Sequence, residues 1–142
     1  MARLLDLGVD FEHWCFACGR RNPTGLQLDF DVSTDRATAR YTGLQRHQGY
    51  DGTLHGGVMA GLVDHVLGCV LYPLMQRGQW AATTEFKLNY LAPVRGGTLV
   101  AESTVVSFTK RTAVVRVEVT NEEQLVCVAQ GTLLVAEPVK KP

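Results

Sequence analysis

The sequence predicts an α+β domain in which a curved antiparallel sheet of five to six strands wraps around one long central helix. Two short strand candidates precede a long apolar segment, and four longer strand candidates follow it. An antiparallel sheet with one apolar face needs a cover, and a helix that is apolar nearly all round needs to be enclosed. Wrapping the sheet around the helix satisfies both requirements.

Length and charge indicate one globular domain over residues 1–142. The chain has 142 residues, of which 46% are hydrophobic and 20% charged, as in ordinary globular domains. The 14 Lys and Arg residues balance the 14 Asp and Glu residues, and the isoelectric point is about 6.9. Because the sequence has no excess of positive charge to bind a phosphate backbone, we expect no nucleic-acid partner.

The strand candidates are recognised by alternation of apolar and polar residues. In residues 111–120, for example, Val115, Val117 and Val119 alternate with polar side chains, which is typical of a half-buried strand. The complete set of strand candidates is 26–32, 36–42, 81–92, 97–108, 111–120 and 125–136.

The central helix is expected over residues 55–76, and Pro73 offers an earlier end or a kink. Residues 58–75 are long and apolar enough to be considered as a membrane span. Asp64 and His65 lie near the middle of that segment, where ionisable groups are costly in lipid. We therefore expect a buried helix and no membrane partner.

The N-terminal extension, residues 1–25, is expected to contain little regular structure. Residues 1–14 form an amphipathic turn or short helix in this interpretation, and residues 15–26, rich in Gly, Pro and Asn, form a loop. No signal peptide is recognised.

The four cysteines are too few and too scattered for a disulfide framework. They are Cys15, Cys18, Cys69 and Cys127, of which the last two lie in apolar segments and are expected in the core. Reduced thiols and the lack of a signal peptide favour a cytoplasmic protein.

The start of the helix carries the strongest chemical signal. Gly56 and Gly57 allow close approach to backbone N–H groups that have no partner within a helix, and such an end suits an oxygen that develops negative charge. Asp64 follows eight residues after Gly56 in an apolar helix, where an unpaired buried carboxylate is costly. The alternative is that the glycines only permit tight packing and that Asp64 pairs with an arginine.

Spacing along the helix favours a dimer. At ~1.5 Å per residue, Asp64 lies roughly 12 Å from Gly56, so one carbonyl group cannot contact both in one chain. If two copies pair with their helices antiparallel, Asp64 of one copy approaches Gly56 of the other. The result is a two-fold homodimer with two composite sites.

Three runs of sequence then resemble a known family. HQGYDGTLHGGVMAGLVDHVLG, TTEFKLNYLAPVRGGTLVAE and VAQGTLLV resemble the hot-dog-fold acyl-CoA thioesterases of the PaaI-type group, and CFACGRRNPTGLQLDF resembles the opening of one branch. The resemblance covers about residues 13–136. It implies a hot-dog fold, dimers that share a continuous sheet and often pair into homotetramers, and hydrolysis of an acyl-CoA. It implies no cofactor, because CoA is part of the substrate.

The resemblance also implies residue roles. Gly56 would polarise the thioester carbonyl with its backbone N–H, and Asp64 of the partner subunit would activate water or attack directly. Thr83 stands where related enzymes place a Ser or Thr that orients the water, and His55 would shape the loop near the thioester sulfur.

One position departs from the pattern of the family. Some relatives carry Asn or Gln seven residues before the oxyanion glycine, whereas this chain has Gly49. Gln48 or His47 is the candidate to substitute for that amide.

Further residues are candidates for substrate binding. Basic residues at strand ends and in the N-terminal loop are candidates for the phosphates of CoA: Arg95, Lys110, Arg111, Arg20 and Arg21. Apolar residues of the helix are candidates for the acyl pocket: Met59, Val63, Leu67 and Tyr72. Gly57, Gln48 and Tyr90 complete the candidate substrate site.

The remaining Cys and His residues are given structural roles. Cys15 and Cys18 with His13 resemble a metal or redox pair, but a structural zinc site needs four ligands and no second Cys-x-x-Cys or His pair follows. We therefore expect no metal site and a loop that packs over the sheet. His65 points away from Asp64, its neighbour in sequence, and is expected in the packing or at the dimer seam.

Two other functions compete with hydrolysis. A hot-dog hydratase or dehydratase normally needs a His paired with an acid, and His55 and Asp64 lie too far apart along one helix. A non-catalytic acyl-CoA-binding domain is favoured by Gly49 and disfavoured by Asp64 and Thr83.

Overall fold

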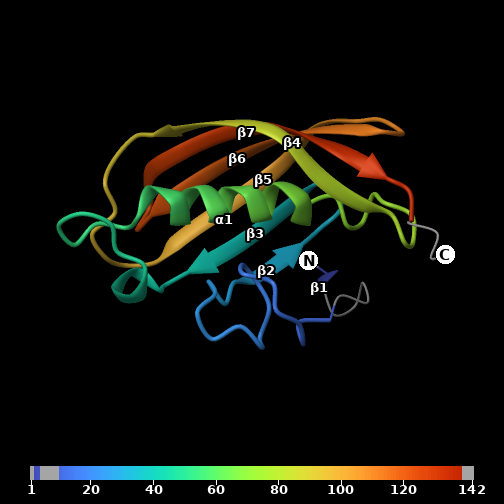
Figure 1. The fold of residues 1–142 in the computed structure, drawn as a ribbon. Coiled ribbons are helices and arrows are strands. Elements are labelled where there is room, and N and C mark those ends of the chain that lie inside the picture. The colour runs from blue at the N-terminus through green and yellow to red at the C-terminus, as the bar shows by residue number, and fades with distance from the viewer. Residues whose placement is uncertain (1, 4–9, 139–142) are drawn as a thin grey trace.

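In the computed structural model, which describes residues 2–3 and 10–138, one helix lies across the concave face of a curved antiparallel sheet (Figure 1). This arrangement confirms the predicted α+β class. The helix is α1 (Gly56–Cys69), and a short 3-10 turn, η2 (Leu44–Arg46), precedes it. The strands are β1 (Ala2–Arg3), β2 (Asp29–Val32), β3 (Arg36–Tyr41), β4 (Trp80–Tyr90), β5 (Leu99–Phe108), β6 (Thr112–Asn121) and β7 (Gln124–Ala136).

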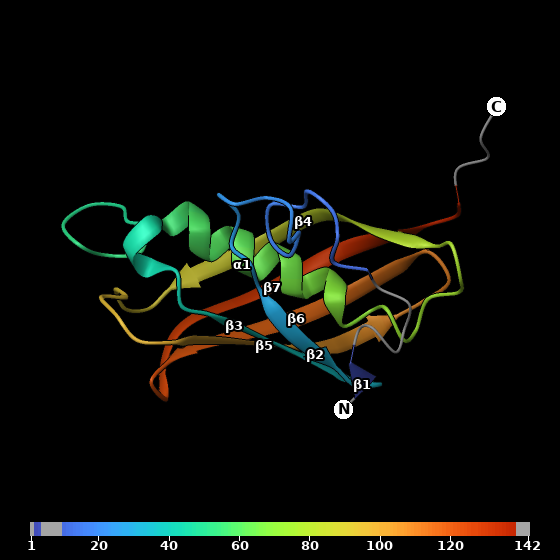
Figure 2. The same ribbon diagram turned by 90° about the horizontal axis from the view of Figure 1, so that it is seen from below.

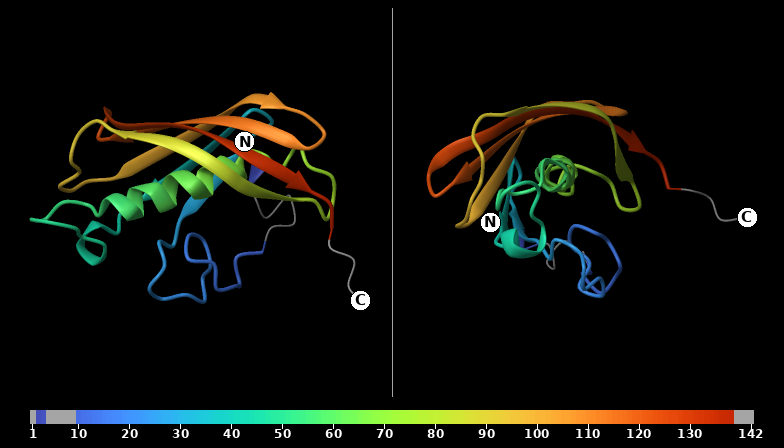
Figure 3. Two further views of the ribbon diagram at one scale, coloured as in Figure 1. Left: turned by 45° about the horizontal axis from the view of Figure 1, so that its top comes forward. Right: turned by 60° about the vertical axis from the view of Figure 1, so that its left-hand side comes forward.

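The order of the strands leaves β4 at one edge of the sheet. The order is β1-β2-β3-β5-β6-β7-β4, and all neighbours are antiparallel. Because β3 and β4 lie on opposite sides of the central strands, α1 crosses the sheet between them, and the sheet arches over the helix (Figure 3). Among the described strands β4 pairs only with β7.

The core lies between the helix and the inner face of this arch. Val115, Val117 and Val119 are fully buried, as their alternation predicted. Leu62 and Val66 of α1 pack against the sheet and are at most 1% exposed. Each such side chain contributes about 1.5–3 kcal/mol through removal of apolar surface from water.

The helix is shorter than predicted. It ends at Cys69 instead of residue 76, and turns follow it, in which the N–H groups of Leu74 and Met75 donate to the carbonyl of Leu71. Pro73 lies in these turns, and because it has no N–H it cannot continue the helical hydrogen bonds. The earlier end that Pro73 suggested is therefore the correct one.

Strand β2 is also shorter than predicted, because it begins at Asp29 instead of residue 26. Gln27 has a positive φ of 54°, which interrupts the extended backbone. The N–H groups of Leu26 and Leu28 donate to loop carbonyls at 2.7 and 2.9 Å instead of joining the sheet.

The prediction of a helix buried nearly all round is wrong for the chain taken alone. One face packs on the sheet, but Gly56, Gly57 and Asp64 are exposed and the neighbouring Gly61 and Gly68 are half-buried. Hydropathy counts Gly and Ala as apolar, although they cover little surface, so it could not distinguish this open face from a buried one. No helix among the described residues has the length and apolar character needed to cross a membrane.

The N-terminal segment lies on the side of α1 away from the central strands (Figures 2 and 3). Half of the turn or helix predicted over residues 1–14 falls outside the described residues; within them, Ala2–Arg3 pair with β2 and residues 10–14 are irregular. The loop does not simply pack over the sheet as expected, because Phe16 lies beside Gly61 of α1. Just before the loop, Phe11 contacts the sheet, and its ring meets that of Phe30 edge to face at 5.6 Å.

Candidate functional site

His55 caps the N-terminus of α1. It has extended backbone angles (φ −62°, ψ 130°), and its ring Nδ1 accepts the N–H of Gly57 at 2.8 Å. The N–H of Gly56 has no acceptor within hydrogen-bonding distance among the described residues. The helix therefore begins with one satisfied N–H and one free N–H, and the free one lies at the position where the sequence predicts an oxyanion donor.

Gly56 lines a smaller pocket, with a volume of about 300 Å³. The hydroxyl of Tyr90 donates to the carbonyl of Gly56 at 2.7 Å, so the end of β4 contacts the start of α1. Apart from Gly56 and Tyr90, the lining residues are mostly apolar: Thr53, Leu54, Met59, Leu91, Ala92, Pro93 and Val94. The structure thus places the predicted substrate residues Met59 and Tyr90 beside Gly56.

Asp64 and Thr83 line a second, larger cavity of about 810 Å³. Asp64 is exposed on the single chain, which corrects the expectation of a buried carboxylate, and it takes part in no ion pair among the described residues. The alternative of a silent Asp64–arginine pair therefore does not hold within one chain. Glu85 and Tyr72 line the same cavity, and no local pattern in the sequence indicated Glu85.

A β-bulge shapes the wall of this cavity. The register of β4 against β7 shifts between Thr83 and Glu85, and the hydroxyl of Thr84 donates to the carbonyl of Thr132 at 3.0 Å. Bulges change the direction of side chains and are frequent beside active sites. Here Thr83, Thr84 and Glu85 all line the cavity.

Gly131 makes room for the bulge. A Cβ on Gly131 would lie 2.7 Å from the Cβ of Phe86 and 2.9 Å from the carbonyl oxygen of Glu85, closer than real contacts allow.

Within one chain the two halves of the predicted site do not converge. Gly56 belongs to the smaller pocket, whereas Asp64 and Thr83 belong to the larger cavity. One small carbonyl group cannot reach both.

The region of Gly49 carries no amide side chain toward Gly56. A Cβ on Gly49 would lie 3.1 Å from the Cα of His55, so the two backbone segments approach closely. The ring of His47 contacts the hydroxyl of Tyr41 and the carbonyl of Thr24, and the amide of Gln48 donates to the carbonyl of Gln45 at 3.5 Å. Neither His47 nor Gln48 lines the pocket of Gly56.

The basic candidates lie at different ends of the sheet, and all are exposed. Arg95 donates to the carbonyl of Asp51 at 3.3 Å, near the start of α1. Lys110 and Arg111 lie in the turn between β5 and β6, and the carbonyl of Arg111 accepts the N–H of Val135 at 2.7 Å, near the first residues of β4. The two arginines of the N-terminal loop are ion-paired: Arg20 with Asp29, and Arg21 with Glu12.

The apolar candidates divide between core and pockets. Val63 and Leu67 are fully buried in the core. Met59 lines the smaller pocket and Tyr72 the larger cavity.

A group of possible metal ligands lies beside Asp64. Cys15, Cys18 and His65 each offer a ligand atom, and these atoms lie within 4.8 Å of one another. Burial lowers the pKa of His65 to about 4 and raises the pKa of the Cys18 thiol to about 12. Sequence spacing did not reveal this group, because His65 comes from a helix 47 residues after Cys18.

Comparison with known proteins identifies the family to which these features correspond. A family model described as the thioesterase superfamily matches residues 51–128, more than half of the 142-residue chain. The medium/long-chain acyl-CoA thioesterase YigI of Escherichia coli is 35% identical over 85 residues, which cover 51% of this chain and 55% of that protein. The chain thus spans about half the length of the curated relatives it matches.

Solved structures confirm the hot-dog fold. A thioesterase from Haemophilus influenzae superposes with a TM-score of 0.79 over 93% of this chain and 94% of its own, at 22% identity. A protein from Streptococcus mutans, solved with acetyl-CoA bound, superposes with a TM-score of 0.70 at 28% identity, over 80% of this chain and 91% of its own.

Proposed function

Since the chain belongs to the thioesterase superfamily, we propose that it hydrolyses acyl-CoA thioesters to the free acid and CoA, at a site assembled from two copies of the chain. One observation carries this proposal. A free N–H at Gly56 and an exposed carboxylate at Asp64 lie on the same helix but open into different pockets. An antiparallel pair of helices would join the two halves.

The edge strand β4 is the surface on which we propose that the second copy pairs. It is 11 residues long, is exposed or half-buried along its whole length, and has a described neighbour on one side only. Such an edge presents unpaired backbone groups and favours pairing with another strand. Antiparallel pairing of two β4 strands would extend the sheet across a homodimer, and two dimers could then form a homotetramer.

The proposed reaction divides the work between the two copies. The Gly56 N–H of one copy stabilises the carbonyl oxygen as it becomes negative. The partner's Asp64 accepts a proton from water or attacks the carbonyl itself, and the partner's Thr83 orients the water. When the C–S bond breaks, the CoA sulfur takes up the proton held by Asp64 or one from water, so CoA leaves as the thiol. If Asp64 attacks directly, water then hydrolyses the acyl–aspartyl anhydride to release the acid. The reaction needs no cofactor.

The same pairing would bring basic residues of both copies together. Arg95 lies near the start of α1, whereas Lys110 and Arg111 lie near the first residues of β4, at the other end of the chain. Antiparallel pairing would place Arg95 of one copy near this turn of the other. We propose that these three residues bind the phosphates of CoA. We also propose that the protein is cytoplasmic and that acyl-CoA is its partner molecule.

A non-catalytic acyl-CoA-binding domain is the second candidate. It is supported by the pocket of Gly56, whose lining residues include no Asn or Gln. The hydratase alternative is weaker, because the Nδ1 of His55 is occupied by the N–H of Gly57 and does not pair with an acid.

Release of free thiol from a panel of acyl-CoAs tests hydrolysis against simple binding. The panel extends from acetyl-CoA through long-chain to phenylacetyl- and benzoyl-CoA. We expect turnover of at least one member, and a loss of about 10²–10⁴-fold in kcat for Asp64→Asn with binding retained. Asp35→Asn, a change at an exposed carboxylate in the β2–β3 turn, is the matched control. CoA-ester binding without turnover by the native protein would instead support the binding domain.

A further inference from the structure

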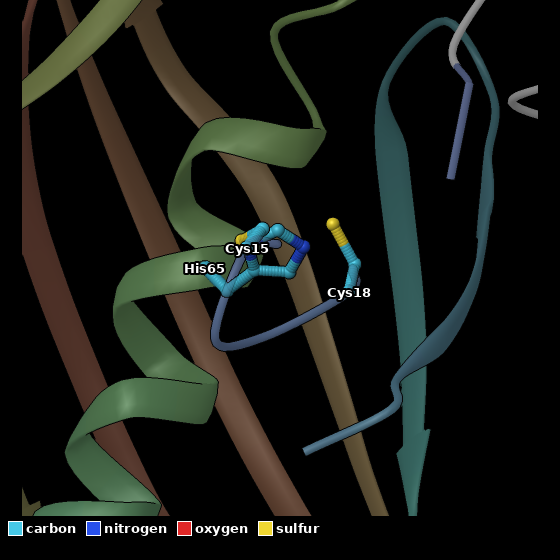
Figure 4. A group of neighbouring side chains, drawn as sticks. All are labelled: Cys15, Cys18 and His65. Carbon is cyan, nitrogen blue, oxygen red and sulfur yellow. The ribbon is translucent and has the colours of Figure 1, made fainter. Parts of the chain in front are cut away.

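The N-terminal segment places two thiols against an imidazole of the central helix. The Sγ atoms of Cys15 and Cys18 and a ring nitrogen of His65 lie within 4.8 Å of one another. The thiols come from the loop and the ring from α1, and the three side chains lie close together (Figure 4). This group takes no part in the proposed hydrolysis.

A tight turn carries the two cysteines. The N–H of Gly19 donates to the carbonyl of Cys15 at 2.9 Å. A Cβ on Gly19 would lie 2.3 Å from the carbonyl oxygen of His13 and 2.4 Å from the backbone N of Cys15, so only glycine fits there. Two cysteines separated by two residues in such a turn have the spacing of a zinc-binding pair.

The buried ring of His65 supplies an independent observation. Its Nε2 is buried and has no hydrogen-bond partner among the described residues, although the ring packs edge to face on Phe30 at 5.1 Å. Leaving a buried polar atom unpaired costs free energy, so such atoms usually indicate a missing partner. A metal ion between the ring and the two sulfurs would accept the unused lone pair.

The chemistry of this ligand set identifies the ion. Two thiolates and an imidazole suit Zn²⁺, which prefers sulfur and nitrogen ligands in tetrahedral geometry. Zn–S bonds of about 2.3 Å and Zn–N bonds of about 2.0 Å place neighbouring ligand atoms roughly 3.5–3.8 Å apart. The observed separations of up to 4.8 Å therefore need to close by about 1 Å.

We propose that Cys15, Cys18 and His65 bind one Zn²⁺ ion and that His13 supplies the fourth ligand. The Nε2 of His13 lies 4.0 Å from the Sγ of Cys18. Its Nδ1 accepts the N–H of Cys15 at 3.2 Å, so ligation through Nε2 moves the ring proton to Nδ1 and releases this contact. The ion would attach the N-terminal segment to α1 at the residue next to Asp64.

Metal content of the full chain tests the proposal. The protein is produced without a metal-binding tag, kept reduced and dialysed, and its zinc is measured by mass spectrometry. We expect one zinc per chain. Replacement by Co²⁺ should give tetrahedral d–d bands and a thiolate-to-cobalt charge-transfer band.

Variants identify the ligands. Cys15→Ser and Cys18→Ser should each halve the charge-transfer band and lower the zinc content, and His65→Gln should lower the zinc content without loss of a thiolate. His13→Ala should weaken zinc binding, and unchanged affinity would exclude His13 as a ligand. Cys127→Ser, a change at a buried cysteine of β7, is the matched control and should still bind one zinc.

A measurement on the native chain keeps the proposal testable if the variants fail to fold. A strong zinc chelator should lower the Tm of the native protein, and added Zn²⁺ should restore it. Substoichiometric zinc without a cobalt band, or a Cys15–Cys18 disulfide as the stable form in the reduced preparation, would overturn the site. These outcomes do not depend on whether the protein hydrolyses acyl-CoA.

Discussion

The hydroxyl of Tyr90 donates a hydrogen bond of 2.7 Å to the carbonyl oxygen of Gly56, so the last residue of β4 contacts the first residue of α1. A Cβ on Gly56 would lie 3.3 Å from the same hydroxyl, which leaves little free space between them. The edge strand therefore holds the peptide that carries the proposed oxyanion donor.

Tyr90→Phe should lower kcat, although it should change the free energy of unfolding only slightly. The hydrogen bond is partly exposed, since Tyr90 is 57% exposed, so we expect a loss of about 0.5–1.5 kcal/mol in the free energy of unfolding. The activity loss follows from a less restrained helix start. Tyr50→Phe is the matched control, because Tyr50 is 90% exposed. Equal kinetics for the two variants would contradict the positioning role of Tyr90.

Gly56→Pro removes the proposed oxyanion donor without a strong conflict with the helix. Proline is favoured at the first helical position, and His55, with ψ 130°, already has the backbone angles that a following proline needs. We expect a fall in kcat of about 10²–10³-fold, the usual effect of losing one such donor. Steady-state kinetics and circular dichroism would measure activity and fold together.

Gly56→Ala is the comparison for this change. It keeps the N–H but adds the Cβ that crowds Tyr90, so it reports the steric part of the effect. If Gly56→Ala loses as much activity as Gly56→Pro, the loss is steric and the N–H has no special role.

Substitutions of His55 separate capping from chemistry. His55→Ala removes the acceptor of the Gly57 N–H and should cost about 0.5–2 kcal/mol of stability, as loss of an N-cap does. His55→Asn supplies another good cap without an imidazole. We expect Asn to restore both stability and most of the activity; a stable but inactive Asn variant would assign a chemical role to the ring.

Gly131→Ala tests the packing behind the bulge of β4. The added Cβ would lie 2.7 Å from the Cβ of Phe86, and overpacking of this kind costs about 1–3 kcal/mol. Gly96→Ala is the control, since a Cβ there meets nothing within 4 Å. Urea denaturation should show a lower midpoint for Gly131→Ala only. Equal midpoints would mean that β4 moves to accommodate the added Cβ without a cost in the free energy of unfolding.

The sequence predicted those features that depend on local pattern. Alternation located the valines of β6, and the paired glycines located the start of α1, because both signals are carried by neighbouring residues. The end of α1 was placed too late, since the apolar run continues into turns around Pro73. The exposure of the Asp64 side chain was not predicted, because the small residues around it on α1 count as apolar yet cover little surface.

Local pattern singled out Cys15, Cys18 and His13, but it could not show that His65 lies beside the two cysteines. The members of the cluster of Cys15, Cys18 and His65 come from a loop and a helix, and only the packing of the N-terminal segment on α1 brings them together. Likewise, Glu85 lines the same cavity as Asp64 next to a β-bulge that no local pattern predicted.

Mixed dimers test most directly the claim that two chains share one acyl-CoA thioesterase site. Gly56→Pro and Asp64→Asn chains with different tags are co-expressed, and the heterodimer is purified through both tags. Each parent homodimer should be nearly inactive, whereas the heterodimer keeps one intact site of two and should hydrolyse acyl-CoA at about half the native rate per dimer. A heterodimer no more active than its parents would contradict a site composed of Gly56 from one copy and Asp64 from the other.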